Sequence, residues 1–215
     1  MNSEVHDLPE PDARERLLHA AEEIFADFGY EGASVRQICA SAGVNIAGVN
    51  YHFGDKEHLY IETVKRAHSC MSKEMEIDDQ SDLSPAQQLE RFIRSIVPEM
   101  HAPASPNALK LMMRELAHPG KAASVVVDEF IRPMALHLVD IMRELLPHYS
   151  EQQRLMTGFS IIGQCLYYRQ NRPVSELIFG KDHLDALTAD AVADHVVRFS
   201  LAALGLAAPI TAENP

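Results

Sequence analysis

The sequence contains few cysteines, no long apolar run and too few basic residues to balance its acidic ones. Its three cysteines, Cys39, Cys70 and Cys165, lie far apart. An odd number of well-separated cysteines fits a reduced, cytoplasmic protein better than a disulfide framework. No run reaches the roughly 20 apolar residues that cross a bilayer, so we expect no membrane span. The acidic N-terminus also lacks the apolar stretch of a signal peptide.

The motifs of common metal sites and enzymes are missing as well. The eleven histidines form no His-x-x-x-His pair, and there is no Cys-x-x-Cys. Such spacings are what metal ligands on helices and in short loops need, so we expect no metal. There is no Gly-x-Ser-x-Gly, no Gly-x-Gly-x-x-Gly and no other Gly-rich phosphate loop. We therefore expect neither an enzyme nor a bound cofactor.

The charge balance limits how the chain could bind nucleic acid. The net charge is −12, which argues against nonspecific binding to nucleic acid or to an anionic membrane. The first 60 residues hold four basic and eleven acidic side chains. A DNA-binding segment here would depend on a few charges, backbone N–H groups and neutral donors. We expect it to bind with modest affinity and as a dimer.

The segment from Ser34 to Tyr60 has the layout of a helix-turn-helix. Its first helix carries an apolar stripe, and Gly43 ends that helix because glycine reaches the left-handed conformation easily. Asn45 can cap a second helix, Ile46 to Phe53, with its side-chain oxygen. That helix is expected to bury Val49 and Phe53 and to leave its other face exposed. Two short helices joined by a glycine turn are typical of DNA-reading proteins, in which the second helix enters the major groove.

Apolar periodicity predicts helices along the rest of the chain, with no convincing strand alternation, so the fold class is all-α with about nine or ten helices. Pro133 falls within a long apolar segment and predicts a kink there. Further helices are expected from Asp12 to Gly29, Lys56 into the seventies, Ser84 to the break at 101–106, Asn107 to Ala117, Ala122 to Leu146, Ser150 to Asn171, a short turn at 174–179, and Thr188 to Leu204.

The residues between Arg14 and Ala67 resemble the tetracycline-repressor-like (TetR) family of transcriptional regulators. The resemblance is carried by IFADFGY at 24–30, SVRQICASAGV at 34–44 and YHFGDKEHLY at 51–60. The C-terminal half is similar to the subgroup with a CerR-type C-terminal domain. The resemblance implies a three-helix DNA-binding domain (12–60) and a larger helical ligand-binding and dimerisation domain (61–205). One position departs from the pattern, because Asn50 stands where tyrosine is usual.

The resemblance also implies which residues contact DNA. Arg36 could instead form a surface salt bridge, Lys56 could pair with Asp55 or Glu57, and the small residues could simply suit a surface helix. Asn50 can donate one hydrogen bond to a phosphate or pair with adenine, and its role stays open. The candidates are Ser34, Arg36, Asn45, Ile46, Ala47, Gly48, Asn50, Tyr51, His52 and Lys56.

Polar residues in otherwise apolar helices are candidates for a small-molecule site, because a few polar groups orient a ligand in an apolar cavity. Methionines, including Met134 and Met142, could line such a cavity or be plain core. Arg114 or Arg169 could meet an acidic ligand or pair internally with Glu115, Asp128 or Glu129. The ligand-binding candidates are Met112, Met113, Arg114, His137, Gln164, Tyr167, Tyr168 and Arg169.

The last two long helices resemble the family's dimer interface, a four-helix bundle shared by two subunits. The alternative is that their apolar residues belong to the core of one subunit. Two-fold symmetry would match a near-palindromic operator. The interface candidates are Phe159, Ile162, Gly163, Leu166, Val192, His195, Val196 and Phe199.

Together these features predict a homodimeric transcriptional repressor that an unidentified small molecule releases from its double-stranded DNA operator. Two alternatives remain at this point: a DNA-binding dimer that ignores small molecules, and a transcriptional activator. A helical enzyme or carrier with a vestigial DNA-binding segment is a third, supported only by the acidic N-terminal residues.

Overall fold

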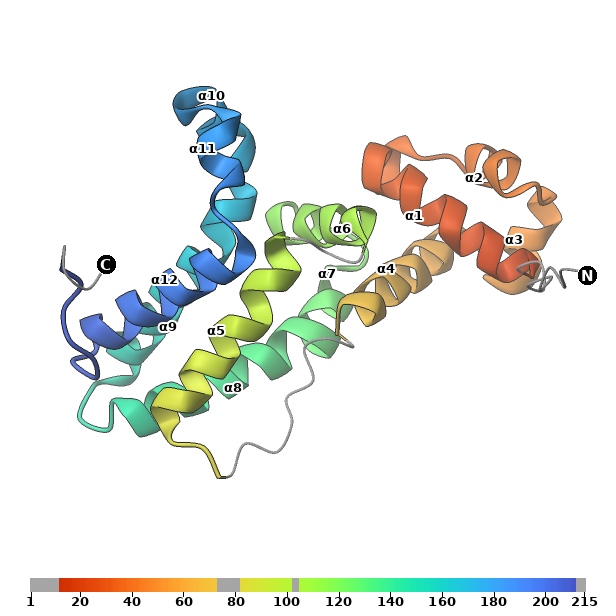
Figure 1. The fold of residues 1–215 in the computed structure, drawn as a ribbon. Coiled ribbons are helices and arrows are strands. Elements are labelled where there is room, and N and C mark those ends of the chain that lie inside the picture. The colour runs from red at the N-terminus through yellow and green to blue at the C-terminus, as the bar shows by residue number, and fades with distance from the viewer. Residues whose placement is uncertain (1–11, 73–81, 102–104, 212–215) are drawn as a thin grey trace, which may run out of the picture. The chain divides into compact units, whose positions relative to one another are not determined.

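A computed structural model of the chain describes residues 12–72, 82–101 and 105–211. Within these ranges, every secondary-structure element is a helix, as the sequence predicts (Figure 1). None of the described helices combines the length and apolarity that crossing a membrane requires. The chain divides into two compact units, residues 1–70 with 107–127, and residues 71–106 with 128–215. The sequence-based division into 12–60 and 61–205 concerns function rather than compactness, and it stays a prediction.

The first unit is built on α1 (Ala13–Gly32). Asp12 caps the helix as predicted, since its carboxylate accepts a hydrogen bond from the Glu15 N–H at 2.8 Å. Leu17, Ala21 and Phe25 are fully buried. The backbone leaves helical geometry at Gly29, with φ 70° and ψ 179°, where the sequence predicts the end of the helix. The element nevertheless continues to Gly32.

Three further helical segments complete this unit around the pair α2 (Val35–Ala42) and α3 (Ile46–His52). α4 (Lys56–Ser72) buries Leu59, Tyr60 and Val64. The Tyr60 ring meets Phe25 edge to face at 4.7 Å between centroids, which packs α4 on α1. α6 (Pro106–Ala117) and α7 (Ala123–Val125) also belong here, apart from the first residue of α6.

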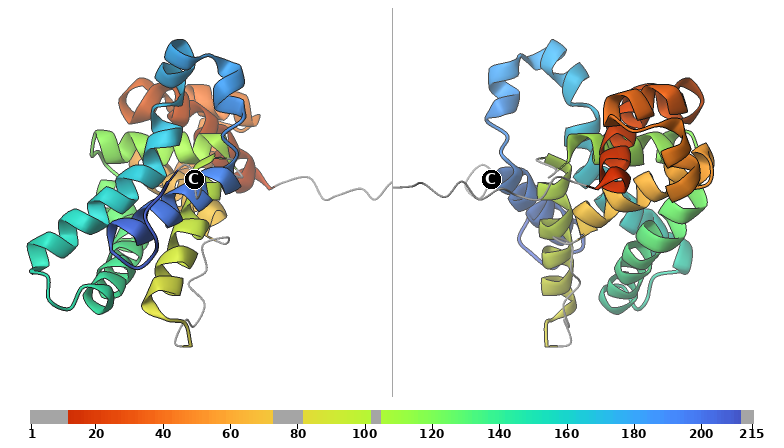
Figure 2. Two further views of the ribbon diagram at one scale, coloured as in Figure 1. Left: turned by 60° about the vertical axis from the view of Figure 1, so that its left-hand side comes forward. Right: turned by 90° about the vertical axis from the view of Figure 1, so that its right-hand side faces the viewer.

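The second unit is a helical bundle. α12 (Ala189–Ala203) packs along α5 (Pro85–His101), and both contact α9 (Glu151–Gln170); α8 (Arg132–Leu145) packs on α5 and α9 (Figure 1). Ser150 forms the predicted capping box at the start of α9, and Thr188 caps α12. α10 (Arg172–Phe179) and α11 (Lys181–Asp185) form a hairpin beyond the end of α9 (Figure 2).

The predicted kink near Pro133 is a π-helical turn, η1 (Val126–Ile131), placed directly before α8. Proline lacks the N–H that would continue the α-helical ladder, and its ring collides with the preceding turn. A wider turn avoids both problems. The chain passes from the first unit to the second inside this turn, between Val127 and Asp128. With the breaks around η1 and α11, the described residues hold more helical segments than the sequence predicts.

Candidate nucleic-acid interface

The helix-turn-helix forms as the sequence predicts. Ser34 and Gln37 build a capping box at the start of α2, and Gly43 ends α2 with φ 62° and ψ 34°, in the left-handed region. The Asn45 side chain caps α3 by accepting a hydrogen bond from the Ala47 N–H at 3.1 Å. Val49 and Phe53 are buried, which fixes the inner face of α3 against the unit.

The opposite face of α3 is exposed. Tyr51 is 85% exposed, and Ile46, Ala47 and Asn50 are exposed beside it. The Tyr51 ring meets the half-buried His52 ring edge to face, with 4.9 Å between the ring centroids. This face offers apolar contacts, one phenol and one amide. Such groups can read base edges but add almost no positive charge.

Gly48 has a reason of its own to be glycine. A Cβ at this position would lie 2.6 Å from Cγ1 of Val44, so packing inside the turn excludes a larger side chain. The close approach to DNA that the sequence suggests is therefore not needed to explain the residue. Ser34 and Asn45 likewise use their side-chain oxygens as helix caps, although both remain exposed.

The basic residues of this unit differ in what they contact. Arg14 pairs with Glu62 at 3.0 Å, and Arg16 donates to the carbonyl oxygen of Ala42 at 3.2 Å. Arg36 is exposed and forms no ion pair within the part of the chain that the structure describes, so the surface salt bridge considered for it is absent there. Arg36 is thus available to a phosphate or a base.

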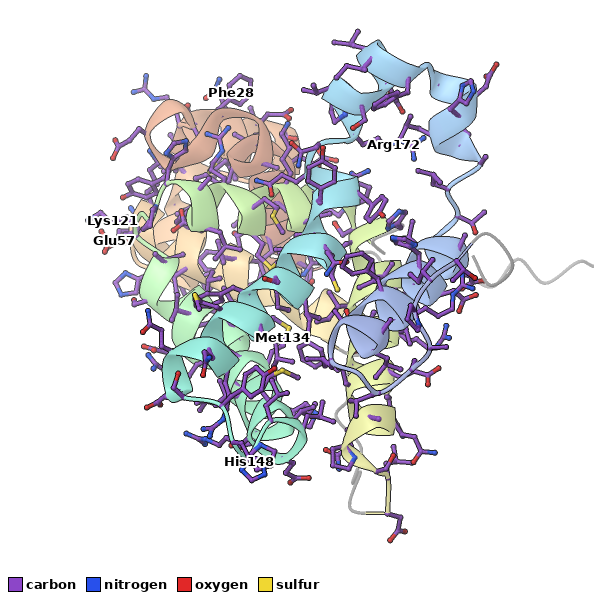
Figure 3. The ribbon with its side chains drawn as sticks, turned by 90° about the vertical axis from the view of Figure 1, so that its left-hand side faces the viewer. Phe28, Glu57, Lys121, Met134, His148 and Arg172 are labelled. Atoms are coloured by element: carbon purple, nitrogen blue, oxygen red, sulfur yellow. The ribbon has the colours of Figure 1, made fainter. Side chains whose placement is uncertain are left out.

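Lys56 does not pair with either carboxylate considered for it. Its Nζ lies over the Tyr30 ring, 4.4 Å from the centroid. Glu57 instead pairs with Lys121 at 2.9 Å, and the two side chains are adjacent in Figure 3. Asp55 caps α4 by accepting from the His58 N–H, and this hydrogen bond lowers the pKa of the Asp55 carboxyl.

The ligand-binding candidates fall in both compact units. Met112, Met113 and Arg114 are half-buried on α6 in the first unit. The other five lie in the second unit, where His137 and Tyr168 are half-buried and Tyr167 is exposed. His137 packs near Phe92, and burial lowers the pKa of its imidazole.

An apolar cavity of about 210 Å³ lies in the second unit, between α5, α8 and α9. None of the eight ligand-binding candidates lines it. Met134 and Met142, both on α8, do line it, as their proposed pocket role suggests (Met134 is labelled in Figure 3). The other lining residues carry no pocket signal in the sequence, because the facing sides of α8 and α9 enclose a cavity only when the helices pack. The lining residues are Phe92, Ile131, Met134, Ala135, Leu138, Val139, Met142, Arg143, Glu151, Arg154, Leu155, Gly158, Phe159 and Ile162.

The interface candidates on α9 and α12 separate into exposed and buried groups. Val192 and Val196 are buried within the protomer, where α12 packs on α5, so for these two the alternative of a single-subunit core holds. Ile162 and Leu166 are half-buried. Phe159 is 71% exposed, and Gly163, His195 and Phe199 are also exposed.

The exposed residues of α9 form a stripe along that helix. Met156, Phe159, Gly163 and Tyr167 are all exposed and follow each other at three- and four-residue spacing, which places them on one helical face. A Cβ at Gly163 would meet nothing within 4 Å, so that part of the helix is open. Tyr167, a ligand-binding candidate, belongs to this surface.

Family models match both parts of the chain. Residues 17–63 match bacterial regulatory proteins of the tetR family. Residues 85–204 match the C-terminal domain of the HTH-type transcriptional dual regulator CecR. The C-terminal subgroup expected from the sequence, called CerR-type above, is therefore the one with the CecR C-terminal domain.

Curated relatives agree with these matches. The HTH-type transcriptional dual regulator CecR of Shigella flexneri is 26% identical over 181 residues, which cover 79% of this chain and 81% of the relative. The HTH-type transcriptional repressor AcnR of Corynebacterium glutamicum is 34% identical over 61 residues, or 28% of this chain and 32% of the relative.

Solved structures share the fold. AibR in complex with isovaleryl coenzyme A and operator DNA has a TM-score of 0.59 at 20% identity, covering 87% of this chain and 97% of that one. FadR from Bacillus subtilis in complex with stearoyl-CoA has a TM-score of 0.58 at 18% identity, covering 85% and 97%. The two family models identify α3, with its exposed face, as the second helix of a DNA-binding helix-turn-helix. The chain belongs to the tetR family of bacterial regulatory proteins, in the group with the CecR C-terminal domain, and is a DNA-binding transcriptional regulator.

Proposed function

We propose that the chain is a homodimeric repressor that a small, predominantly apolar molecule releases from a near-palindromic operator. The observation that carries the proposal is the apolar cavity between α5, α8 and α9, which could hold such a molecule. The exposed face of α3 supplies the surface for DNA. A regulator of this kind acts where the chromosome is, so we place it in the cytoplasm. The proposal assigns it no catalytic step.

On the DNA side, Ile46, Ala47 and Tyr51 would contact base edges, and Arg36, His52 and Lys56 would contact phosphates. Asn50 would add one polar contact of either kind. Because this set contains only two permanently charged side chains, one subunit would bind weakly. Two subunits on two half-sites would bind far more tightly, since the second contact becomes intramolecular.

On the dimer side, the exposed α9 stripe supports pairing with a second copy. Phe159 would lie near its centre, and Gly163 would let two helices approach closely. The His195 and Phe199 rings, 5.9 Å apart between centroids on α12, would extend the same surface. Large apolar side chains at the centre of an interface are the usual source of its stability.

The effector would act by shifting a population. A ligand changes operator binding only to the extent that it binds the two states of the protein with different affinity. The similar structures of AibR and FadR contain acyl-coenzyme A ligands, which supports an acyl chain or a related apolar group as the effector's buried part.

The test combines DNA binding with cavity occupation. The wild-type dimer should bind the DNA upstream of its own gene more tightly than a scrambled duplex over a salt titration, and octanol or octanoate should weaken that binding. Ala135→Phe would narrow the cavity and should abolish the ligand effect. Leu136→Phe, at the neighbouring exposed position outside the cavity lining, is the matched control and should keep it.

Two outcomes would favour the alternatives. If no apolar ligand changes operator binding or raises the melting temperature, the chain is a DNA-binding dimer without an effector. Loss of target-gene expression on deletion of the regulator indicates an activator. Equal affinity for the upstream and scrambled duplexes at every salt concentration would refute the operator-binding proposal.

A further inference from the structure

A second cavity lies in the first unit and differs in chemistry from the apolar one. It is a cleft of about 820 Å³ between the C-terminal part of α1, the α4 residue Tyr60, and α6 with the loop that follows it. Its lining includes Phe28, Tyr30, Arg114, His118 and Lys121. The cleft therefore combines aromatic and basic side chains, and two carboxylates, those of Glu31 and Glu115, also line it.

Arg114 is the cation in this cleft that has no acidic partner. Its Nη2 donates to the backbone oxygen of Asp27 at 3.3 Å, and no carboxylate lies within ion-pair distance of it among the described residues. Neighbouring Glu115 is engaged elsewhere, since its two oxygens accept from the Tyr60 hydroxyl and the Gly120 N–H. A guanidinium carries five N–H donors, so this half-buried group can still bind an anion.

The absence of a side chain at Gly29 leaves room for the Arg114 guanidinium. A Cβ at Gly29 would lie only 2.2 Å from Nη1 of Arg114, so any other residue would displace the guanidinium. Gly29 also has φ 70°, a conformation that side chains rarely adopt. Among the described residues, the guanidinium thus donates to the main chain rather than to a carboxylate.

The two lysines that line the cleft are already paired with carboxylates. Lys110 pairs with Asp27 at 2.6 Å, and Lys121 pairs with Glu57 at 2.9 Å. Arg114 is therefore the basic side chain left without an ion pair among these three, and because Glu31 also lines the cleft, the cleft suits a single anionic group rather than a polyanion. In the same cleft, Phe28 is 56% exposed and supplies an apolar wall; Figure 3 labels it at the edge of this unit.

We propose that this cleft binds a small organic anion, with one carboxylate or phosphate group on Arg114 and an aromatic or apolar body against Phe28. Arginine matches both groups because its planar fork can donate two parallel hydrogen bonds. The site lies in the same compact unit as α2 and α3, and it is separate from the proposed effector cavity. Its occupation does not depend on the repressor mechanism.

The experiment measures binding of benzoate and phenyl phosphate to the full-length protein without DNA, by calorimetry and by thermal shift. Both should bind, whereas benzamide, the neutral analogue of benzoate, should not. Arg114→Met keeps the bulk of the side chain and should weaken binding at least about tenfold, the typical effect of losing hydrogen bonds to a charged group. Phe28→Ala should weaken binding of benzoate but not of inorganic phosphate.

Arg143→Met is the matched control, because Arg143 lines the apolar cavity and pairs with Asp140 at 2.8 Å. It should leave benzoate binding unchanged. The proposal is overturned if neither anion binds, if benzamide binds equally well, or if Arg143→Met rather than Arg114→Met removes binding. Displacement of benzoate by a nonspecific DNA duplex would identify a DNA phosphate as the occupant and would also overturn it.

Discussion

Replacing Tyr60 by phenylalanine tests the contact that joins α4 to α6 in the first unit. Tyr60 is fully buried and donates its hydroxyl to Oε1 of Glu115 at 2.5 Å, while the Gly120 N–H donates to Oε2 at 3.1 Å. Glu115 is only 4% exposed. Burial, and then the hydrogen bond to Glu115, raise the pKa of Tyr60, so the phenol remains a donor at all ordinary pH values.

The substitution removes one of the two hydrogen-bond donors from a buried carboxylate. A buried group that loses its partner costs about 1–3 kcal/mol of unfolding free energy, and more when it is charged. For a protein of this size each kcal/mol lowers the melting temperature by about 2–4 °C, so Tyr60→Phe should lower it by at least about 2 °C. The ring stays in place against Phe25 and Tyr30, so little packing energy is lost.

The assay is thermal and chemical unfolding at one fixed dimer concentration, with amide exchange to locate the change. Tyr149→Phe is the control, because that ring is 46% exposed and has no hydroxyl hydrogen bond among the described residues. Glu115→Gln in the Tyr60→Phe background should recover part of the loss, since a neutral amide tolerates the missing donor better. A loss for Tyr60→Phe no larger than for Tyr149→Phe would refute the reasoning.

Three further predictions concern backbone strain, DNA binding and pH. Gly29→Ala should lower stability by about 1–3 kcal/mol in chemical unfolding, because its φ of 70° with ψ near 180° is a conformation that only glycine adopts without strain. Lys56→Ala should reduce the dependence of log affinity on log salt by about 0.9 per subunit, or about 1.8 for the dimer, in operator titrations; an unchanged slope would exclude a phosphate contact. Burial lowers the pKa of His101 from 6.5, so the unfolded chain binds more protons at acidic pH. Stability should fall as pH drops below 6.5, and less so in His101→Gln, in unfolding measured from pH 7.5 to 5.5.

Local signals account for what the sequence predicts well. The caps at Asp12, Asn45, Ser150 and Thr188 each depend on a side chain that reaches its own backbone two or three residues away. Gly43 follows the same logic, because a left-handed residue ends a helix wherever the rest of the chain lies. Such features can be inferred from a short stretch of sequence.

The candidate sites depend on contacts between distant residues, which a local sequence pattern does not contain. Val196 and Phe199 are both apolar and both on α12, but only packing on α5 decides that Val196 is core and Phe199 is surface. The sequence makes Arg114 a ligand-binding candidate of the C-terminal domain, and it does not show that Arg114 donates to Asp27 and lies beside Gly29, both more than 80 residues earlier in the chain.

The position of α6 also alters how the acidity of the N-terminal residues should be judged. The first 60 residues hold four basic and eleven acidic side chains, which makes DNA binding by that segment alone electrostatically unfavourable. The compact unit that contains α2 and α3 also includes residues 107–127, which add three basic side chains and only one acidic one. Two of them, Lys110 and Lys121, pair with Asp27 and Glu57 and so neutralise acids of α1 and α4. Glu57 directly follows Lys56, so its neutralisation removes a charge that would repel the phosphate proposed to bind there.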